Sequence, residues 1–220
     1  MALISKLKMY IVPKGSKPRR ILSGPFKGIQ MCLSLEHQSQ VLAGLFEREA
    51  YPWLERLSDG IVTAIDIGAA HGEYTLFFLL RTAAQKVYAF EPDSAILPVL
   101  RHNLELNGAA RSERLEVIGK PVNEEMTLDS FAKCIRTPCL IKMDVDGHEA
   151  AILNGAKKLN SVPGVRWLIE THSKDLELAC IDKLKLVGFK TQVVPNAWWR
   201  VILPEQRVSE QNRWLVGWKD

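Results

Sequence analysis

The chain has 220 residues, of which 47% are hydrophobic and 25% charged, and its formal net charge is +4. This length predicts one domain with a full core, and the composition excludes disordered and fibrous classes of protein. No apolar run reaches the roughly 18 residues that a transmembrane helix needs, and the N-terminus lacks the continuous apolar stretch of a signal peptide.

The four cysteines are scattered and form no C-x-x-C pair: Cys32, Cys134, Cys139 and Cys180. Such spacing is typical of free thiols in a reducing compartment, so we expect a cytoplasmic protein without a zinc site.

The first 35 residues hold seven Lys or Arg and no acid. Breakers at Pro13, Gly15 and Pro18 predict irregular structure over residues 1–24. We interpret residues 1–39 as a basic N-terminal arm and lead-in, and residues 40–220 as the folded domain. The arm is either a solvated tail or a segment that contacts an anionic surface.

Two further segments lead into the domain. Residues 26–35 are predicted to form a strand pair or hairpin arm. Residues 37–58 have apolar residues at helical spacing, interrupted at Pro52, which predicts one or two short helices that close a ligand site. Glu47 and Glu49 are expected to be surface charges within reach of a ligand.

Residues 61–93 carry the main pattern of the chain. A short β-branched run predicts a buried strand that ends near Asp66, and GAAHG then turns the chain into a helix over 73–82. A second strand is predicted over 86–90, with Glu91 just beyond it, nineteen residues after Gly72. This arrangement is typical of half a nucleotide-binding α/β sheet. The alternative is an ordinary strand, turn and helix, with Glu91 a surface acid.

The turn does not fit a dinucleotide. The G-x-G-x-x-G pattern needs glycine where this chain has Ala70 and Glu73. A carboxylate at the start of a helix is a poor neighbour for a pyrophosphate but a good one for an ammonium or sulfonium group.

The remaining elements alternate between helices and strands. We predict helices over 94–106, 124–138, 148–159 and 175–188, and strands over 114–122, 139–143, 165–172, 189–194 and 213–220, with a hairpin or loop over 197–206. The last two strands have no helix between them. The predicted fold is therefore a Rossmann-like three-layer sandwich with a seven-stranded, mostly parallel sheet and an antiparallel C-terminal edge strand.

Polar residues follow the fourth and fifth strands of this predicted sheet. Asp144, Asp146 and His148 come after one, and Glu170 and His172 end the other. The carboxyl ends of parallel strands meet at one edge, where open α/β sheets bind ligands. Either histidine is a candidate base, with Asp144 orienting it or a substrate, and each could instead be a helix-cap or surface residue. The carboxylates with His172 could also hold Mg²⁺.

Several motifs occur together and in order: IDIGAAHGEYTL, VYAFEPD, TLDSF, LIKMDVDGHEAAILNGA and LIETH. With them the chain resembles the FkbM family of S-adenosylmethionine-dependent methyltransferases over roughly residues 40–192. The resemblance implies a class I Rossmann-like fold and methylation of a hydroxyl on a sugar-like or small natural-product acceptor. Ala70 departs from the glycine pattern of such enzymes, and the loop between VIGKP and TLDSF is short.

The resemblance also assigns roles to residues. The expected S-adenosylmethionine-binding residues are Asp66, Gly68, Ala69, His71, Gly72, Thr75, Glu91, Pro92 and Pro121. Asp144, His148 and His172 are expected to be catalytic, and Asp146 and Glu170 to bind the acceptor, with no metal. The rival hypotheses are a non-catalytic binding module with this scaffold and a nicotinamide-dependent oxidoreductase. The oligomeric state is left open.

Overall fold

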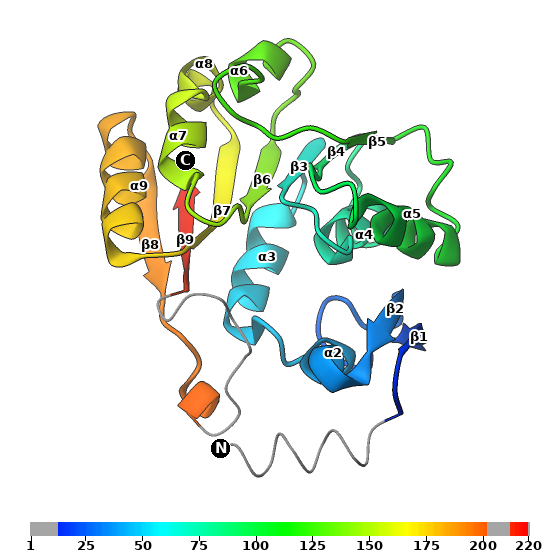
Figure 1. Cartoon of the computed structure of the whole chain (residues 1–220). Helices are drawn as coiled ribbons and strands as arrows, with labels where there is room; N and C mark the ends of the chain where they lie inside the picture. Colours follow the sequence, from blue (N-terminus) through cyan, green and yellow to red (C-terminus); the bar gives the residue numbers. More distant parts are fainter. Residues whose placement is uncertain (1–12, 202–211, 220) are drawn as a thin grey trace.

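A seven-stranded sheet forms the centre of the molecule (Figure 1). The computed structural model describes residues 13–201 and 212–219. In the sheet the strands follow the order β5-β4-β3-β6-β7-β9-β8, and β9 alone runs antiparallel to both of its neighbours. The strands are β3 (Thr63–Ile67), β4 (Lys86–Phe90), β5 (Leu115–Ile118), β6 (Cys139–Met143), β7 (Val165–Thr171), β8 (Lys190–Val194) and β9 (Arg213–Trp218).

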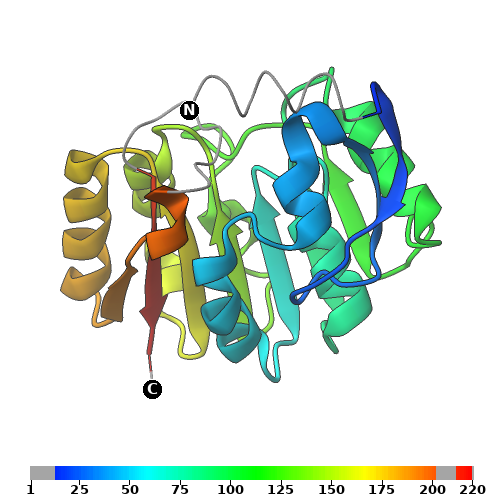
Figure 2. The same ribbon diagram turned by 90° about the horizontal axis from the view of Figure 1, so that it is seen from below.

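Helices cover both faces of the sheet (Figures 1 and 2). One face packs against α3 (Tyr51–Ser58), α4 (Glu73–Arg81) and α5 (Leu97–Leu106). The other packs against α6 (Leu128–Phe131), α7 (Glu149–Asn154), α8 (Lys157–Ser161) and α9 (Lys174–Leu186). The predicted three-layer, Rossmann-like architecture is thereby confirmed.

The strands divide the core into two parts because successive side chains point to opposite faces. In β3, Ala64 belongs to the core under α3, α4 and α5, whereas Ile65 and Ile67 belong to the core under α6 to α9. In β6, Leu140 lies on the first side and Ile141 on the second. By the same alternation Asp66 and Lys142 point toward the α4 side, so both polar side chains lie buried beside the apolar core there.

The lead-in segment forms a small unit beside α5. β1 (Ser16–Arg20) and β2 (Gln30–Ser34) pair antiparallel, followed by α2 (Leu35–Ala43) and the 3-10 turn η1 (Arg48–Ala50). Asn103 of α5 and Asn107, which caps the C-terminus of that helix, accept hydrogen bonds from the backbone of β2. The irregular structure expected over residues 1–24 is therefore wrong for β1, and residues 1–12 lie outside the described part. The predicted domain boundary at residue 40 falls inside α2 and stays a prediction.

The helix predicted over 124–138 is only the short α6, Leu128–Phe131, and three other helix boundaries also differ from those predicted. Pro52 lies in the first turn of α3 and so begins a helix, since its missing N–H is not needed there. Pro98 likewise lies in the first turn of α5, which starts at Leu97 instead of residue 94. The predicted helix 148–159 is two helices, α7 and α8, separated at Gly155 and Ala156.

Part of the predicted loop over 197–206 is described: residues 198–201 form the 3-10 turn η2 (Trp198–Val201), and the rest lies outside the described residues. Within residues 13–201 and 212–219, no helix is long and apolar enough to cross a membrane.

Candidate functional site

The turn between β3 and α4, residues 68–72, is called the glycine turn below. Gly68, Ala70 and Gly72 all adopt left-handed backbone conformations, with φ of 74°, 45° and 95°. A Cβ on Gly68 would lie 1.8 Å from the backbone oxygen of Asp144, and one on Gly72 would lie 2.5 Å from Leu100. Both glycines are required by this close packing as well as by φ. The packing also sets the glycine turn directly against the loop that follows β6.

Glu91 is tied to the glycine turn. Its side chain accepts hydrogen bonds from the backbone N–H of Ala70 at 2.8 Å and of Asp93 at 2.8 Å, and the residue is buried. The alternative of a surface acid is therefore wrong. Asp93 accepts from the N–H of Ala95, as expected of a residue that caps the next turn. Glu91 thus closes one side of the glycine turn at the carboxyl end of β4.

Asp66 lies beneath the turn and is fully buried. Its carboxylate accepts a hydrogen bond from the Thr75 hydroxyl at 2.6 Å, and its other oxygen lies 3.4 Å from the Lys142 ammonium. Burial raises the pKa of Asp66, although Lys142 and Thr75 act in the opposite direction. Thr75 is itself fully buried. Both residues, predicted to contact the cofactor, therefore support the turn from within.

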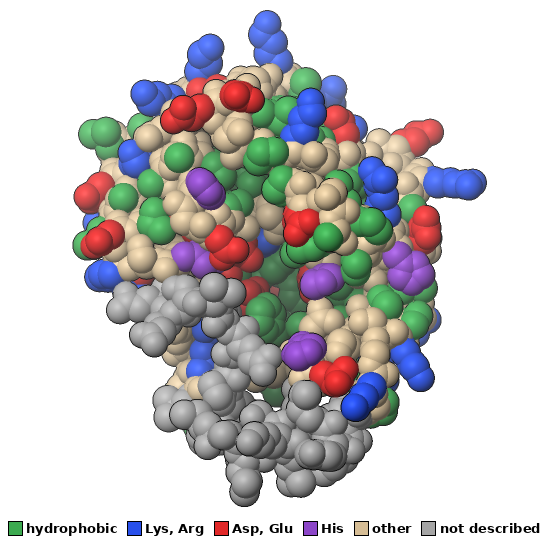
Figure 3. All heavy atoms as spheres, in the orientation of Figure 1, with side chains coloured by type: hydrophobic (Ala, Val, Ile, Leu, Met, Phe, Trp, Pro, Cys, Tyr) green, Lys and Arg blue, Asp and Glu red, His purple; other side chains and the backbone are tan. Residues whose placement is uncertain are grey.

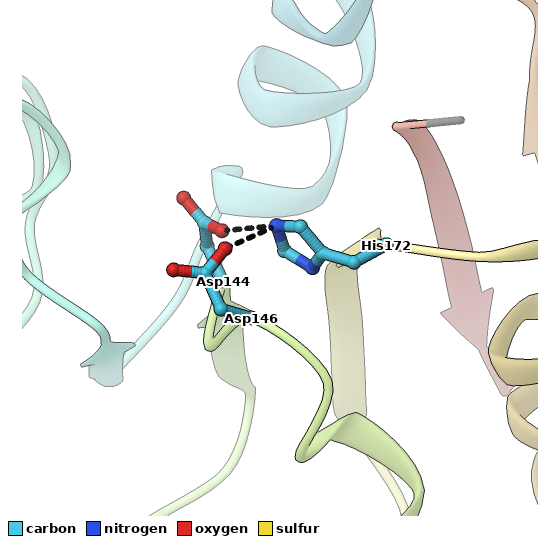
Figure 4. Close-up of side chains that lie close together, drawn as sticks. All are labelled: Asp144, Asp146 and His172. Carbon is cyan, nitrogen blue, oxygen red and sulfur yellow. Dashed lines mark ion pairs between the residues drawn. The ribbon is translucent and has the colours of Figure 1, made fainter. Parts of the chain in front are cut away.

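Three predicted side chains meet beyond β6 and β7, and Figure 4 shows how they face one another. Nε2 of His172 lies 3.3 Å from Asp144 and 3.1 Å from Asp146. On the opposite side of the ring, Nδ1 lies 2.5 Å from the buried carboxylate of Glu149. We call Asp144, Asp146 and His172 the strand-end cluster. Glu149 fixes the orientation of the imidazole, because one ring nitrogen is engaged below while the other faces the two aspartates.

The strand-end cluster changes the acid–base properties of His172. Burial alone would lower the pKa of its ring, but hydrogen bonds to Asp144 and Glu149 outweigh this and raise the pKa from 6.5 to about 10. The imidazole is then protonated at neutral pH. In this protonated form the ring is a cation beside Asp144, and the base role of His172 stays a prediction.

Two acidic side chains lie on the inner side of the cluster. Oxygens of Glu47, Asp144 and Glu170 lie within 4.8 Å of one another, and both glutamates are buried. Glu47 accepts a hydrogen bond from the Tyr74 hydroxyl at 2.8 Å. Glu170 and His172 thus both reach Asp144, as expected for alternate residues at the end of a strand. Glu47 was expected at the surface, which is wrong.

The acidic residues of this site could also bind a metal cation. The ligand atoms of Asp144, Asp146 and His172 lie within 4.8 Å of one another, as do those of the three acids on the inner side. Oxygen-rich groups of this kind suit Mg²⁺. The metal alternative therefore keeps a geometric basis, and it is tested below.

The other predicted residues lie further out. His148 is exposed just before α7 and lines a separate cavity of about 330 Å³ with Val122 and Ile152. It does not join the strand-end cluster. Pro92 and Pro121 are exposed at the same edge of the sheet, and Ala69 is buried in the glycine turn. The carbonyl of His71 accepts a hydrogen bond from Asn103.

The face that carries these residues is hollowed. Figure 3 shows a depression near its centre, lined by hydrophobic and acidic side chains, with histidines along the rim. Acidic groups therefore gather where the carboxyl ends of the parallel strands open to the outside, which matches the ligand edge of an α/β sheet.

The roles of Lys142 and Glu149 were not predicted from the sequence. A lysine in the middle of the otherwise apolar run CLIKM was a usable signal, because lysine is almost never fully buried unless it is paired. Glu149 lies in the first turn of α7, where an acid commonly serves only the helix dipole. Its position directly after His148 gave no indication that it would turn inward toward β7.

Comparison with known proteins agrees with this geometry. Residues 102–181 match the family model described as the methyltransferase FkbM domain, which confirms the resemblance over that segment. No curated protein matches the sequence significantly.

Solved structures share the fold at low sequence identity. Precorrin-6y C5,15-methyltransferase from Geobacter metallireducens has 14% identity and a TM-score of 0.54, covering 79% of this chain and 87% of its own. An rRNA methylase from Streptococcus thermophilus has 17% identity and a TM-score of 0.54, covering 79% and 98%. Methyltransferase FkbM from Methylobacillus flagellatus has 18% identity and a TM-score of 0.54, covering 71% of this chain but only 43% of that longer one.

Proposed function

We propose that this protein transfers the methyl group of S-adenosylmethionine to a hydroxyl of a small or sugar-like acceptor. The observation that carries the proposal is the direct packing of the glycine turn on Asp144, where no room exists even for a Cβ on Gly68. A donor held by the turn would therefore lie beside the strand-end cluster. The match to the FkbM methyltransferase domain supports the same reaction class.

The groups around the glycine turn fit this donor. Glu91 stands at the end of β4 with both oxygens accepting only one backbone N–H each, which leaves acceptor capacity for ribose hydroxyls. Glu73 begins α4, where a carboxylate favours an ammonium group over a pyrophosphate. When bound, S-adenosylmethionine supplies an electrophilic methyl group on a sulfonium, whose carbon–sulfur bond breaks as the acceptor oxygen attacks.

The chain then has two tasks, to align the acceptor and to take up its hydroxyl proton. Asp144 is the group we assign to the proton, because its carboxylate is partly exposed, with a side-chain exposure of 30%. The His172 imidazolium, 3.3 Å away, orients this carboxylate. Holding the reactants in line can lower the activation barrier by up to about 7–11 kcal/mol. A positioned base accelerates such a reaction by about 10²–10⁴-fold, which is the smaller effect.

Calorimetric titration with S-adenosylhomocysteine tests the donor half of the proposal. We expect saturable binding by the wild-type protein, and the absence of binding at millimolar ligand would remove the proposal. A calorimetric titration with NADH is the control. We expect no binding of NADH, because Ala70 and Glu73 disfavour a pyrophosphate. Binding of NADH instead would revive the oxidoreductase hypothesis.

Turnover tests the acceptor half. The protein is incubated with S-adenosylmethionine and a panel of sugars, sugar nucleotides and small alcohols, and S-adenosylhomocysteine is quantified by mass spectrometry. We expect at least one hydroxyl-bearing acceptor to raise product formation. We expect Asp144→Asn to abolish that rise even at donor concentrations that saturate the variant. Binding without turnover on every acceptor would favour the non-catalytic module.

A further inference from the structure

Lys142 is a charged residue in the middle of a buried strand. It belongs to β6, which lies between β3 and β7 at the centre of the sheet, and its side chain is only 3% exposed. Taking an ammonium out of water is costly unless partners compensate for it. An apolar residue would fill this position more easily, so the contacts of Lys142 need an explanation.

Those contacts reach both halves of the proposed site. The ammonium donates a hydrogen bond to the carbonyl of Gly68 at 2.8 Å, and it lies 3.4 Å from Asp66 and 3.8 Å from Asp144. The pairing register places Asp66 directly beside Lys142 on neighbouring strands. The ring of Tyr74 also lies 4.9 Å from the ammonium, so the charge is enclosed on the α4 side of the sheet.

Asp144 is held from two sides. One carboxylate oxygen faces His172 at 3.3 Å, and the other faces Lys142 at 3.8 Å. Two cations at opposite oxygens restrict the rotation of the carboxylate plane, because turning the group would weaken both ion pairs. The same ammonium donates to the Gly68 carbonyl, so one atom contacts both Asp144 and the glycine turn.

We propose that Lys142 is a positioning residue that couples the glycine turn to Asp144, so that donor binding and the orientation of the acceptor-side carboxylate are linked. This inference rests on the proposed function, since it assigns the turn to the donor and Asp144 to the acceptor. The coupling is reciprocal. A change at Asp144 alters the affinity for the donor through Lys142, and donor binding alters the orientation of the Asp144 carboxylate.

A double-mutant cycle on donor binding tests the coupling. The affinity for S-adenosylhomocysteine is measured by calorimetry in four proteins: the wild type, Lys142→Met, Asp144→Asn, and the double variant. We expect Lys142→Met to weaken binding about 10- to 100-fold, as for the loss of a charged hydrogen bond that holds the turn. We expect Asp144→Asn to change affinity by about threefold or more in the wild-type background and by much less beside Lys142→Met.

The cycle separates positioning from a purely structural role. A lysine that only stabilised the fold would lower the folded fraction, but its effect on the affinity of folded protein would be absent or independent of Asp144. Equal effects of Asp144→Asn in both backgrounds, or unchanged affinity in Lys142→Met, would overturn the inference. Wild-type protein that does not bind at all would instead overturn the proposed function, and the inference with it.

Lys142→Met leaves the Asp66 carboxylate buried without its cation, and this variant could fail to fold. The cycle is then run on Lys142→Met combined with Asp66→Asn, in which neither partner of the buried pair remains charged. Replacing both members of such a pair is far less destabilising than removing one. The same non-additivity is expected, measured against Asp66→Asn alone, and additive effects in this background would equally refute the coupling.

Discussion

The ionisation of His172 depends on a carboxylate that touches no ligand in the proposed reaction. Glu149 is fully buried and accepts from Nδ1 at 2.5 Å, so Glu149→Gln replaces a charged acceptor with a neutral one of the same shape. A hydrogen bond between charged groups contributes about 1.5–3 kcal/mol, and each pKa unit corresponds to about 1.36 kcal/mol. We therefore expect the pKa of His172 to fall by about 1–2 in this variant.

The same change should alter how stability depends on pH. The folded pKa of His172, about 10, exceeds its ordinary value of 6.5, so the contribution of the protonated ring is fully present below pH 6.5 and is lost as the pH rises toward 10. Asp146, one of the ion-pair partners of His172, is 84% exposed, so solvent screens its contribution to the stability of the protonated ring. After this discount we expect about 1–3 kcal/mol of pH-dependent unfolding free energy, reduced by Glu149→Gln.

Ring-nitrogen NMR of histidine-labelled protein measures the pKa directly, and urea unfolding at several pH values measures the stability. Glu113→Gln, a change at an exposed glutamate outside the cluster, is the matched control and should leave His172 unaffected. A wild-type ring that titrates near its ordinary value, or one that ignores Glu149→Gln, would refute the reasoning and restore His172 as a candidate base.

Three further outcomes are expected. Gly68→Ala should destabilise the fold by about 2–5 kcal/mol in urea unfolding, because its Cβ would meet a backbone oxygen at 1.8 Å, whereas Gly60→Ala, equally left-handed but with open space, should cost only about 1–2 kcal/mol. Equal costs would contradict the packing argument. Glu91→Ala should weaken S-adenosylhomocysteine binding by about 1.5–3 kcal/mol in calorimetry, and unchanged affinity would displace Glu91 from the site. Donor binding and turnover should persist in EDTA, while a loss restored by Mg²⁺ would make Asp144 and Asp146 cation ligands.

The glycine turn and the order of elements could be predicted from the sequence because they follow local rules. A β-branched run, two glycines and an acid at a fixed distance determine a strand, a turn and a second strand end, and all three lie where predicted. The first and last residues of the helices were harder to predict. Pro52 and Pro98 are compatible either with ending a helix or with starting one, and only tertiary packing selects the second.

The polar interior was harder to predict, since its members come from distant parts of the chain. Glu47 reaches the site from its position just before η1, and its partner Tyr74 lies 27 residues away. Glu149 and His172 meet because α7 packs against α9, the helix that follows His172 in the chain. A charged residue that the sequence pattern places at the surface is buried when another element packs over it. The periodicity of a segment does not show which other element will pack against it.

The position of β9 has a consequence for how the molecule is assembled. β8 makes its ladder hydrogen bonds with β9 only, and β9 in turn pairs with β7, so the later strand in the sequence separates the earlier one from the sheet. Because the chain is made from its N-terminus, β8 is synthesised before its native partner, residues 213–218. The five strands β3 to β7 pair only with one another or with β9 and precede it in the chain, so the strand ends that carry Glu91 and Asp144 can be in place first.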